Sequence, residues 1–457
     1  MKLAEHGQNI RGRNPDPSCQ LRQRILNRKA RIGVVGLGYV GLPLAGAIVR
    51  AGYRVIGYDI DEFKVAQLRA GRSYIGHIPN DQISTWVGDK RLYATADMHQ
   101  LRDADAILIC VPTPLTPHRE PDLSYIVSTT EELMPHVRAG QLIVLESTTY
   151  PGTTRDVMCP ILERSGLRSG RDFFLAYSPE REDPGNPRYS TAEIPKVVGG
   201  DGPLALELAQ ALYKRIVTRT VPVSSLETAE AVKLTENIFR AVNIALVNEL
   251  KDVYEAIGVD MWEVIDAAKT KPFGFMPFYP GPGLGGHCLP IDPFYLTWKA
   301  REHGLPTRFI ELAGEINTSR PRAVVERTAK ALDDREGRGL KGARILVLGV
   351  AYKNDVEDVR ESPGLRIIQL LEQRGAIADF HDPYVPVIPV TRETPELAGR
   401  RSVQLDRERL GNYDAVLICT DHQIVDYRLV TENAGLVIDT RNACRACLDV
   451  AGKVVKA

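Results

Sequence analysis

One cysteine lies in a stretch whose composition argues against regular secondary structure. The stretch GPGLGGHCLPIDP, residues 281–293, is rich in glycine and proline, and it contains Cys288 between His287 and Asp292. Such a stretch predicts a loop whose backbone can pack closely against a ligand. A thiolate there could attack an aldehyde carbon, and the resulting thiohemiacetal could lose a second hydride to become a thioester. The loop therefore favours oxidation of an alcohol to an acid, with a buried structural cysteine as the alternative.

A glycine motif nearer the N-terminus has the spacing of a dinucleotide site. The sequence GLGYVG, residues 36–41, follows a predicted strand and opens a predicted helix, and Asp59 ends the next predicted strand. Gly36 allows a tight turn, Gly38 lets the backbone meet a pyrophosphate, and Gly41 lets helix and strand pack closely. Asp59 would accept hydrogen bonds from the adenosine ribose and repel an added phosphate. The motif predicts NAD rather than NADP, against the alternative of a glycine turn without a ligand.

A lysine and an asparagine lie four residues apart in the segment KLTEN. On a helix, Lys233 and Asn237 share one face and could reach a single substrate oxygen together. The alternative is a pair of solvated side chains on a helix surface. The position of the pair, directly after the dinucleotide domain, favours a role at the substrate.

The elements that must position these residues alternate between strand and helix in two regions. Strand patterns occur in residues 30–61, 104–114, 140–152 and 173–183, and the same pattern returns from ARILVLGVAYKND onward. Between them, a helix is predicted from about Ser224 to Ile257, because apolar residues recur at helical spacing without glycine or proline. The sequence predicts an α/β protein with two Rossmann-like doubly wound domains, whose parallel sheets are joined by a helical middle domain containing this long central helix.

The predicted boundaries divide the chain into four parts. We expect an N-terminal extension at 1–29, an NAD-binding domain at 30–223, a helical dimerisation domain at 224–332 and a substrate-binding α/β domain at 333–457. The extension should form an amphipathic helix at LRQRILNRKA, and no chemistry is assigned to it. One apolar face of the long helix exceeds what its own domain can cover, which predicts a homodimer or a higher homo-oligomer.

Composition and charge exclude several classes of function. Lys plus Arg and Asp plus Glu both number 58, which gives no electrostatic basis for binding nucleic acid or a membrane surface. No long apolar segment or signal-peptide pattern is present, so a cytoplasmic protein with a small-molecule partner is expected. Seven cysteines without a framework spacing fit thiols in a reducing compartment. The pair Cys444 and Cys447 is interpreted as incidental, and no metal site is predicted.

Six motifs, taken in order along the chain, resemble one enzyme family. They are GLGYVGLPLA, ESTTYPG, YSPERED, KLTEN, GPGLGGHCLPIDP and GVAYKNDVEDVRESP, and they resemble the UDP-glucose/GDP-mannose dehydrogenase family. The resemblance implies oxidation of a UDP-sugar at C6 in two steps, with two NAD per turnover. It also implies a nucleophilic role for Cys288 and a role in stabilising an oxyanion for Lys233 and Asn237.

The motifs and the resemblance together assign three sets of residues. The catalytic set is Cys288, Lys233, Asn237, Asp292, Glu180 and Thr148, where the last two position and activate water. The cofactor set is Gly36, Gly38, Tyr39, Val40, Gly41, Asp59, Thr113 and Arg360. The substrate set is Glu180, Lys233, Asn237, Tyr279, Gly285, Lys353 and Arg441.

The segment before the thiol departs from the UDP-glucose members of the family. His287 and KPFGFMPFYPGPG are similar to the N-acetylhexosamine members, so an N-acetylglucosamine substrate, feeding bacterial surface polysaccharide synthesis, is expected. N-acetylgalactosamine, N-acetylmannosamine and glucose substrates remain alternatives. Two further hypotheses are a two-electron β-hydroxyacid dehydrogenase, which would lack the second α/β domain, and a non-enzymatic NAD-sensing protein, whose thiol loop would be inert.

Overall fold

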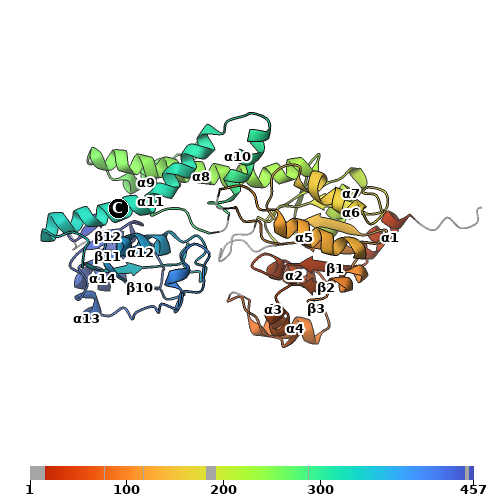
Figure 1. Cartoon of the computed structure of the whole chain (residues 1–457), viewed down its shortest axis with the longest axis horizontal. Helices are drawn as coiled ribbons and strands as arrows, with labels where there is room; N and C mark the ends of the chain where they lie inside the picture. The colour runs from red at the N-terminus through yellow and green to blue at the C-terminus, as the bar shows by residue number, and fades with distance from the viewer. Residues whose placement is uncertain (1–15, 77, 117, 182–191, 287, 448–451) are drawn as a thin grey trace, which may run out of the picture. The chain divides into compact units, whose positions relative to one another are not determined.

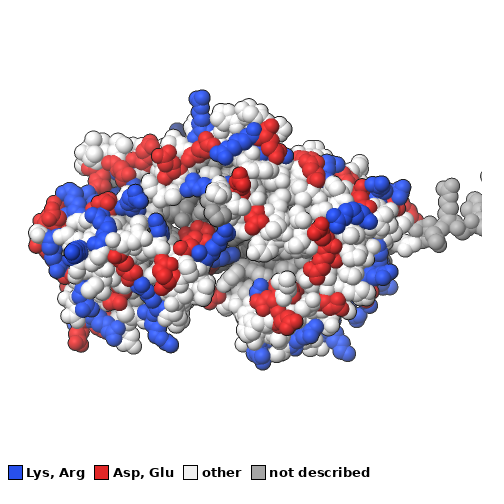
Figure 2. Space-filling model, viewed as in Figure 1, with Lys and Arg blue, Asp and Glu red and all other residues white. Residues whose placement is uncertain are grey.

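The chain divides into two compact units in the computed structural model, and each unit is described by itself. The structure describes residues 16–76, 78–116, 118–181, 192–286, 288–447 and 452–457. Unit 1 comprises the described residues up to Thr116 together with Pro121–Lys233, and unit 2 comprises those of Pro117–Glu120 and Leu234–Ala457. Figure 1 labels the helices and strands, and Figure 2 shows acidic and basic side chains interspersed over the visible face, in keeping with the balanced composition.

Unit 1 is built on a twisted sheet that, in its described residues, has eight strands in the order β3-β2-β1-β4-β5-β6-β7-β8. The strand order reverses direction between β1 and β4, as in dinucleotide-binding domains. The strands are β1 (Arg31–Val35), β2 (Arg54–Tyr58), β3 (Leu92–Thr95), β4 (Ala106–Ile109), β5 (Leu142–Leu145), β6 (Phe174–Tyr177), β7 (Lys196–Gly200) and β8 (Thr220–Pro222).

Helices cover both faces of this sheet, which confirms the predicted doubly wound arrangement. Neighbouring residues of β1 point to opposite faces. Val34 packs in a core with α1, α2 and α7, whereas Val35 packs in a core with α5, α6 and the start of α8. The helices are α1 (Pro17–Leu26), α2 (Gly41–Arg50), α3 (Glu62–Arg69), α4 (Asn80–Gly88), α5 (Ser124–Leu133), α6 (Cys159–Glu163), α7 (Pro203–Tyr213) and α8 (Leu226–Ala256).

Two neighbouring strands of this sheet, β7 and β8, run against the predicted direction. The sequence predicts a parallel sheet, and all neighbouring strands of unit 1 do pair in parallel except β6 and β7, which are antiparallel. Tyr177 pairs with Gly199 and Ala176 with Gly200. The reversal brings the first residues of β7 to the sheet edge where β5 and β6 end. That edge is where ligands bind in open α/β sheets.

The N-terminal helix is also shifted from its predicted place. It was predicted over residues 21–30, but α1 covers Pro17–Leu26. The Asp16 carboxylate accepts a hydrogen bond from the Ser18 amide, and Pro17 occupies the first helical turn, where a missing amide hydrogen is not needed. Arg28 has a positive φ of 56°, which is incompatible with continuing the helix.

The long helix predicted from the sequence begins in unit 1 and continues from Leu234 into unit 2, whose first part is helical. Helix α8 (Leu226–Ala256) has 31 residues, close to the predicted span. The helices that follow are α9 (Met261–Ala268), α10 (Asp292–Glu302) and α11 (Arg308–Glu336). None of the helices in the described part of the chain is long and apolar enough to cross a bilayer.

The second part of unit 2 is the second α/β domain predicted from the sequence. Its described residues form a parallel sheet of five strands in the order β10-β9-β11-β12-β13. The strands are β9 (Arg344–Leu348), β10 (Ile377–His381), β11 (Ala415–Ile418), β12 (Val437–Asp439) and β13 (Val454–Lys456), and the helices are α12 (Pro363–Gln373), α13 (Arg407–Leu410) and α14 (Tyr427–Asn433).

Candidate functional site

The glycine turn after β1 has no space for a side chain at two of its glycines but has space at the third. Gly36 has a positive φ of 86°, and a Cβ there would lie 2.5 Å from the Cys110 carbonyl oxygen. A Cβ on Gly41 would overlap the carbonyl oxygen of Gly36. A Cβ on Gly38, by contrast, would meet nothing within 4 Å, and no side chain caps the N-terminus of α2. The turn therefore exposes backbone at a helix N-terminus, which suits a pyrophosphate.

Asp59 lies beside this turn because β1 and β2 are parallel neighbours. Its Oδ2 accepts hydrogen bonds from the Leu37 amide at 2.8 Å and from Lys64 Nζ at 3.3 Å, and its Oδ1 accepts one from the Asp61 amide at 2.9 Å. Each carboxylate oxygen can accept more than one bond, so the group can also accept ribose hydroxyls.

The other cofactor residues of unit 1 lie near the same sheet edge. Val40 precedes the first residue of α2, Tyr39 belongs to the glycine turn, and Thr113 is buried in the loop after β4. The strand order reverses between β1 and β4, which is where dinucleotides bind in such sheets. The residues present in unit 1 thus fit NAD.

Two predicted water-positioning residues follow neighbouring strands of unit 1. Thr148 is half-buried after β5, and Glu180 follows β6. The Glu180 carboxylate accepts a hydrogen bond from Lys196 Nζ at 3.0 Å. Lys196 Nζ also donates to Glu146 at 2.5 Å, and the Tyr213 hydroxyl donates to the same Glu146 carboxylate. Sequence reasoning missed Glu146, Lys196 and Tyr213.

The pKa values of the Glu146 and Lys196 side chains are shifted by burial and by the neighbouring charges. Burial raises the pKa of the Glu146 carboxyl, although the Lys196 ammonium opposes that effect. Burial alone would lower the pKa of Lys196, but the two carboxylates outweigh it and raise that pKa above its usual value. The ammonium group therefore stays charged between the carboxylates of Glu146 and Glu180.

The loop that carries Thr148 is anchored by a buried carboxylate on α8. Glu230 accepts hydrogen bonds from the Gly152 amide at 2.6 Å, from the Thr154 amide at 2.9 Å and from the Thr154 hydroxyl at 2.6 Å. Gly152 has a φ of 104°, a conformation that favours glycine. Burial raises the pKa of Glu230 to about 7, although these hydrogen bonds oppose the shift. Glu230 precedes Lys233 by one helical turn, so one helix supports both.

In unit 2, the thiol loop leads directly into a helix. The loop prediction is confirmed for its described residues up to Ile291, but Asp292 is already the first residue of α10, because proline is tolerated in a first helical turn. The amides of Ile291 and Asp292 donate to the Cys288 carbonyl oxygen at 3.2 and 2.8 Å. His287 lies outside the described residues.

Two of the predicted catalytic residues meet beneath this loop. Asn237 Nδ2 donates to Asp292 Oδ2 at 2.5 Å, and both side chains are buried. Lys233 lies one turn earlier on α8 and is also buried, and in the described part of the chain its ammonium group has no hydrogen-bond or ion-pair partner. The side chains of Lys233 and Asn237 are therefore held in place by a helix rather than being mobile on a surface.

The glycines of the thiol loop pack against the second α/β domain. The Gly286 amide donates to the Arg360 carbonyl oxygen at 2.9 Å, and a Cβ on Gly285 would lie 2.6 Å from the Tyr352 Cβ. A Cβ on Gly281 would lie 2.5 Å from the Arg441 guanidinium, whose Nε donates to the Cys419 carbonyl oxygen at 2.9 Å. Larger residues at these glycines would displace the loop.

The remaining predicted residues of unit 2 are less closely gathered. Lys353 lies in the turn after β9, next to Tyr352. The Arg360 guanidinium is held by the Asp358 carboxylate at 2.6 and 3.0 Å. The Tyr279 hydroxyl donates to Asp266 at 2.9 Å and is partly exposed. The assigned roles of Lys353, Arg360 and Tyr279 stay predictions.

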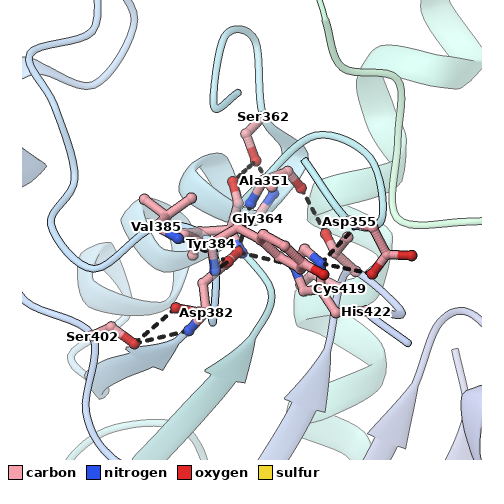
Figure 3. A network of polar contacts seen from close by, with 12 residues as sticks. Ala351, Asp355, Ser362, Gly364, Asp382, Tyr384, Val385, Ser402, Cys419 and His422 are labelled. Carbon is pink, nitrogen blue, oxygen red and sulfur yellow. Dashed lines mark hydrogen bonds and ion pairs between the residues drawn. The ribbon is translucent and has the colours of Figure 1, made fainter. Parts of the chain in front are cut away.

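A buried network holds the turn after β9, in which Tyr352 and Lys353 also lie. Figure 3 shows the residues of this network. The Asp382 carboxylate accepts hydrogen bonds from the amides of Val350 at 2.7 Å and Ala351 at 2.9 Å and lies 3.1 Å from His422 Nε2. The Asp355 amide donates to His422 Nδ1 at 3.0 Å, so Nε2 carries the proton and donates to Asp382. Burial would raise the pKa of Asp382, but these hydrogen bonds lower it.

Some of the missed residues had a signal in the sequence. Glu146 directly follows the apolar run LIVL, and a carboxylate at the end of a buried strand is a candidate for a site. Lys196 and His422 carried no such signal. All seven cysteines are among the described residues and none forms a disulfide there, and Cys444 is buried in the short turn Ala443–Ala446.

Comparison with known proteins accounts for most of the chain. Residues 30–217 match the NAD binding domain of the UDP-glucose/GDP-mannose dehydrogenase family, residues 227–319 its central domain and residues 346–446 its UDP binding domain. The first of these matches identifies NAD as the cofactor.

The names of similar proteins refer to different sugars. The chain is 35% identical to the UDP-N-acetyl-D-glucosamine 6-dehydrogenase of Pseudomonas aeruginosa, over 86% of this chain and 90% of the relative. It is also 35% identical to the NDP-N-acetyl-D-galactosaminuronic acid dehydrogenase of Ralstonia nicotianae, over 90% and 95%. The structure of UDP-D-ManNAc dehydrogenase from Pyrococcus horikoshii is similar with a TM-score of 0.81 and 33% identity, over 90% of this chain and 96% of that one. This chain therefore belongs to the UDP-glucose/GDP-mannose dehydrogenase family.

Proposed function

We propose that the protein oxidises C6 of a UDP-N-acetylhexosamine to the uronic acid in two NAD-dependent steps, with UDP-N-acetylglucosamine as the substrate. Membership of the family, with its NAD-binding and UDP-binding domains, supports an NAD-dependent oxidoreductase of UDP-sugars. The observation that carries the two-step chemistry is the thiol loop. Cys288 lies four residues before the first residue of α10, and the buried Asp292–Asn237 pair lies at the start of that helix.

The proposed roles follow from what each side chain can do. NAD, when bound, accepts one hydride from C6 in each oxidation. The Cys288 sulfur adds to the C6 aldehyde carbon and forms a thiohemiacetal, which becomes a thioester when the second hydride leaves. Lys233 and Asn237 stabilise the negative charge that develops on the C6 oxygen. Water then adds to the thioester, the carbon–sulfur bond breaks, and the acid leaves while the thiolate is restored.

Unit 1 supplies the residues proposed for that last step. Thr148 and Glu180 position the water, and the Glu180 carboxylate accepts its proton as the new carbon–oxygen bond forms. The hydrogen bond that Glu180 accepts from Lys196 supports this role, because it orients the carboxylate. Asn237 would in turn be oriented by its bond to Asp292, so each proposed catalytic side chain has a supporting partner or helix.

The choice of sugar rests on the segment before the thiol loop. Phe275, Met276 and Tyr279 are exposed apolar or aromatic residues of this segment, and they could contact an N-acetyl group. We therefore expect UDP-N-acetylglucosamine to exceed UDP-glucose at least tenfold in kcat/KM, a gap of about 1.4 kcal/mol. N-acetylgalactosamine and N-acetylmannosamine substrates are the competing outcomes, since proteins with such names are equally similar. The uronic acid product would enter a bacterial surface polysaccharide, such as the O-antigen of lipopolysaccharide.

One experiment tests this proposal as a whole. The protein is incubated with NAD and each UDP-sugar in turn, and NADH is counted against the sugar consumed. Two NADH per sugar, with no aldehyde detected, is the expected result. One NADH per sugar would favour a two-electron enzyme, although the match of residues 346–446 to a UDP binding domain argues against a β-hydroxyacid dehydrogenase. The absence of NADH with every sugar would favour an NAD-sensing protein.

We also propose that two copies of the chain pair through α8. Phe239, Leu246 and Val253 follow one another at intervals of seven, so they share a helix face, and they are 50%, 49% and 51% exposed. Ile257, four residues after Val253, is 66% exposed. A symmetric dimer would bury this row of apolar side chains against its own copy. Light scattering that shows a monomer at working concentration would contradict the pairing.

A further inference from the structure

A chain of four polar side chains runs from the core of unit 1 to the edge of its sheet. The Tyr213 hydroxyl donates to Glu146, Glu146 accepts from Lys196, and Lys196 donates to Glu180. The Glu146 side chain is 0% exposed and the Glu180 side chain is 13% exposed. Glu180 is therefore the end of the chain that water or a ligand can reach.

The reversed strand β7 explains why a lysine is present at this edge. Tyr177 of β6 pairs with Gly199 of β7, and continuing this antiparallel register places Lys196 opposite Glu180. In an all-parallel sheet, the first residue of β7 would lie at the opposite edge, away from the carboxyl ends of β5 and β6. The ion pair between Lys196 and Glu180 thus depends on the direction of one strand.

Lys196 is held on two sides within this chain of side chains. The ammonium group lies between two carboxylates, at 2.5 Å from Glu146 and 3.0 Å from Glu180. Glu146 is in turn fixed by the hydroxyl of Tyr213, which is fully buried. A buried ion pair contributes little to stability compared with an apolar replacement, so stability alone does not account for these charges. Their position at the ligand-binding edge of the sheet points to chemistry instead.

We propose that Lys196 is a positioning residue for the hydrolytic step: its ammonium group holds the Glu180 carboxylate in the orientation that faces the attacking water. This inference rests on the proposed function, because it concerns hydrolysis of the thioester on Cys288. In that step, water adds to the thioester carbon, its proton passes to Glu180, and the sulfur leaves as thiolate. This hydrolysis is not a redox step, and it follows both hydride transfers. A residue that acts only in hydrolysis is therefore not required for the two hydride transfers.

The test compares two variants that differ only at Lys196. Replacing Lys196 alone would leave the Glu146 carboxylate as an unpaired buried charge. The control is therefore Glu146→Gln, which keeps the ion pair between Lys196 and Glu180, and the test variant is Glu146→Gln combined with Lys196→Met. Both are mixed rapidly with NAD and UDP-N-acetylglucosamine, and NADH and the intact mass of the protein are followed.

The expected result separates oxidation from hydrolysis. The test variant should release its first two NADH within about threefold of the control rate, whereas its steady-state kcat should fall at least about 30-fold. The protein should then carry the mass of the sugar as a thioester. A merely structural role would slow the oxidation and hydrolysis steps together. That outcome, or a steady-state kcat equal to that of the control, would overturn the inference.

A double-mutant cycle with Glu180 sharpens the test. If Lys196 acts through Glu180, adding Lys196→Met to the control that already carries Glu180→Gln should lower kcat by less than about twofold. A full additional loss would show that Lys196 acts by another route and would overturn the inference. Failure of the proposed function is seen separately, because the wild-type protein would then yield one NADH per sugar and no thioester.

Discussion

The two sheets of this protein repeat one local pattern but use it differently. In unit 1 the segment DAILIC, residues 105–110, enters β4, and in unit 2 the segment DAVLIC, residues 414–419, enters β11. Asp105 accepts a hydrogen bond from the Arg31 amide at 2.9 Å, and Asp414 accepts one from the Arg344 amide at 2.7 Å. In each case the acceptor aligns the start of the central strand with its neighbour.

The two sheets differ in the carboxylate that follows the next strand along the chain after the first strand, which is β2 in unit 1 and β10 in unit 2. Asp59, after β2, accepts a hydrogen bond from one amide of the glycine turn, and a Cβ on Gly38 of that turn would meet no other atom within 4 Å. Asp382, after β10, accepts two amides of the corresponding turn, two amides of its own loop and the His422 ring. The acceptor sites of Asp382 are therefore occupied by groups of its own domain, whereas Asp59 can still accept hydrogen bonds from ribose hydroxyls. A strand, turn and carboxylate pattern does not by itself identify a cofactor site.

The turn of unit 2 differs from the glycine turn of unit 1 in what it contacts. Gly285 and Gly286 of the thiol loop pack on Tyr352 in the turn of unit 2, so that turn supports the loop that carries Cys288. Cys288→Ala should lower the rate of acid formation by about 1,000-fold or more, since no thioester can form. Acid formation is measured as the second NADH per sugar, with Cys444→Ala as the matched control. Wild-type turnover in Cys288→Ala would end the assignment.

Cofactor preference tests the carboxylate of unit 1. Asp59 should favour NAD over NADP by about 2 to 4 kcal/mol, through hydrogen bonds to the ribose and repulsion of a phosphate. In Asp59→Asn the ratio of kcat/KM for the two cofactors should therefore fall by about 30-fold or more. An unchanged ratio, or equal use of both cofactors by the wild-type protein, would remove the distinction drawn for Asp59.

Stability tests the carboxylate of unit 2. Asp382→Asn replaces an acceptor of five donors by a group with one acceptor oxygen, so some buried amides lose their partner. The free energy of unfolding should fall by about 2 to 4 kcal/mol. The ratio of NAD to NADP use should stay at the wild-type value. If Asp382→Asn changed that ratio while leaving the melting temperature unaltered, the two carboxylates would have been assigned the wrong way round.

A third buried carboxylate gives a smaller, pH-dependent effect. Burial raises the pKa of Glu230 from 4.5 to about 7, so the folded protein binds this proton more tightly than the unfolded chain does. Its contribution to stability is therefore greatest below pH 4.5 and falls by about 3 kcal/mol as the pH rises to about 7. The difference in unfolding free energy between wild type and Glu230→Gln, measured by urea titration from pH 5 to 8, should follow this fall. A difference independent of pH would show that Glu230 is not protonated in the folded state.

Much of the candidate site was visible in the sequence because its signals are local. A glycine that must adopt a positive φ, a carboxylate one strand later and a long run of helical spacing depend on neighbouring residues. This explains the correct prediction of the turn at Gly36, of α8 and of the thiol loop. The start of α10 at Asp292 and the place of α1 were misjudged by a few residues, because the effect of proline depends on which helical turn it occupies.

The sequence by itself determined which residues could do chemistry; the tertiary structure decided which of them are held together. The short strand KVVGG has the same apolar pattern in either direction, so only its pairing with β6 sets Lys196 beside Glu180. The closure of Asp382 by His422 and the anchoring of Gly152 by Glu230 likewise join residues 40 and 78 positions apart. Such contacts depend on strand direction and long-range packing, which no local run of residues specifies.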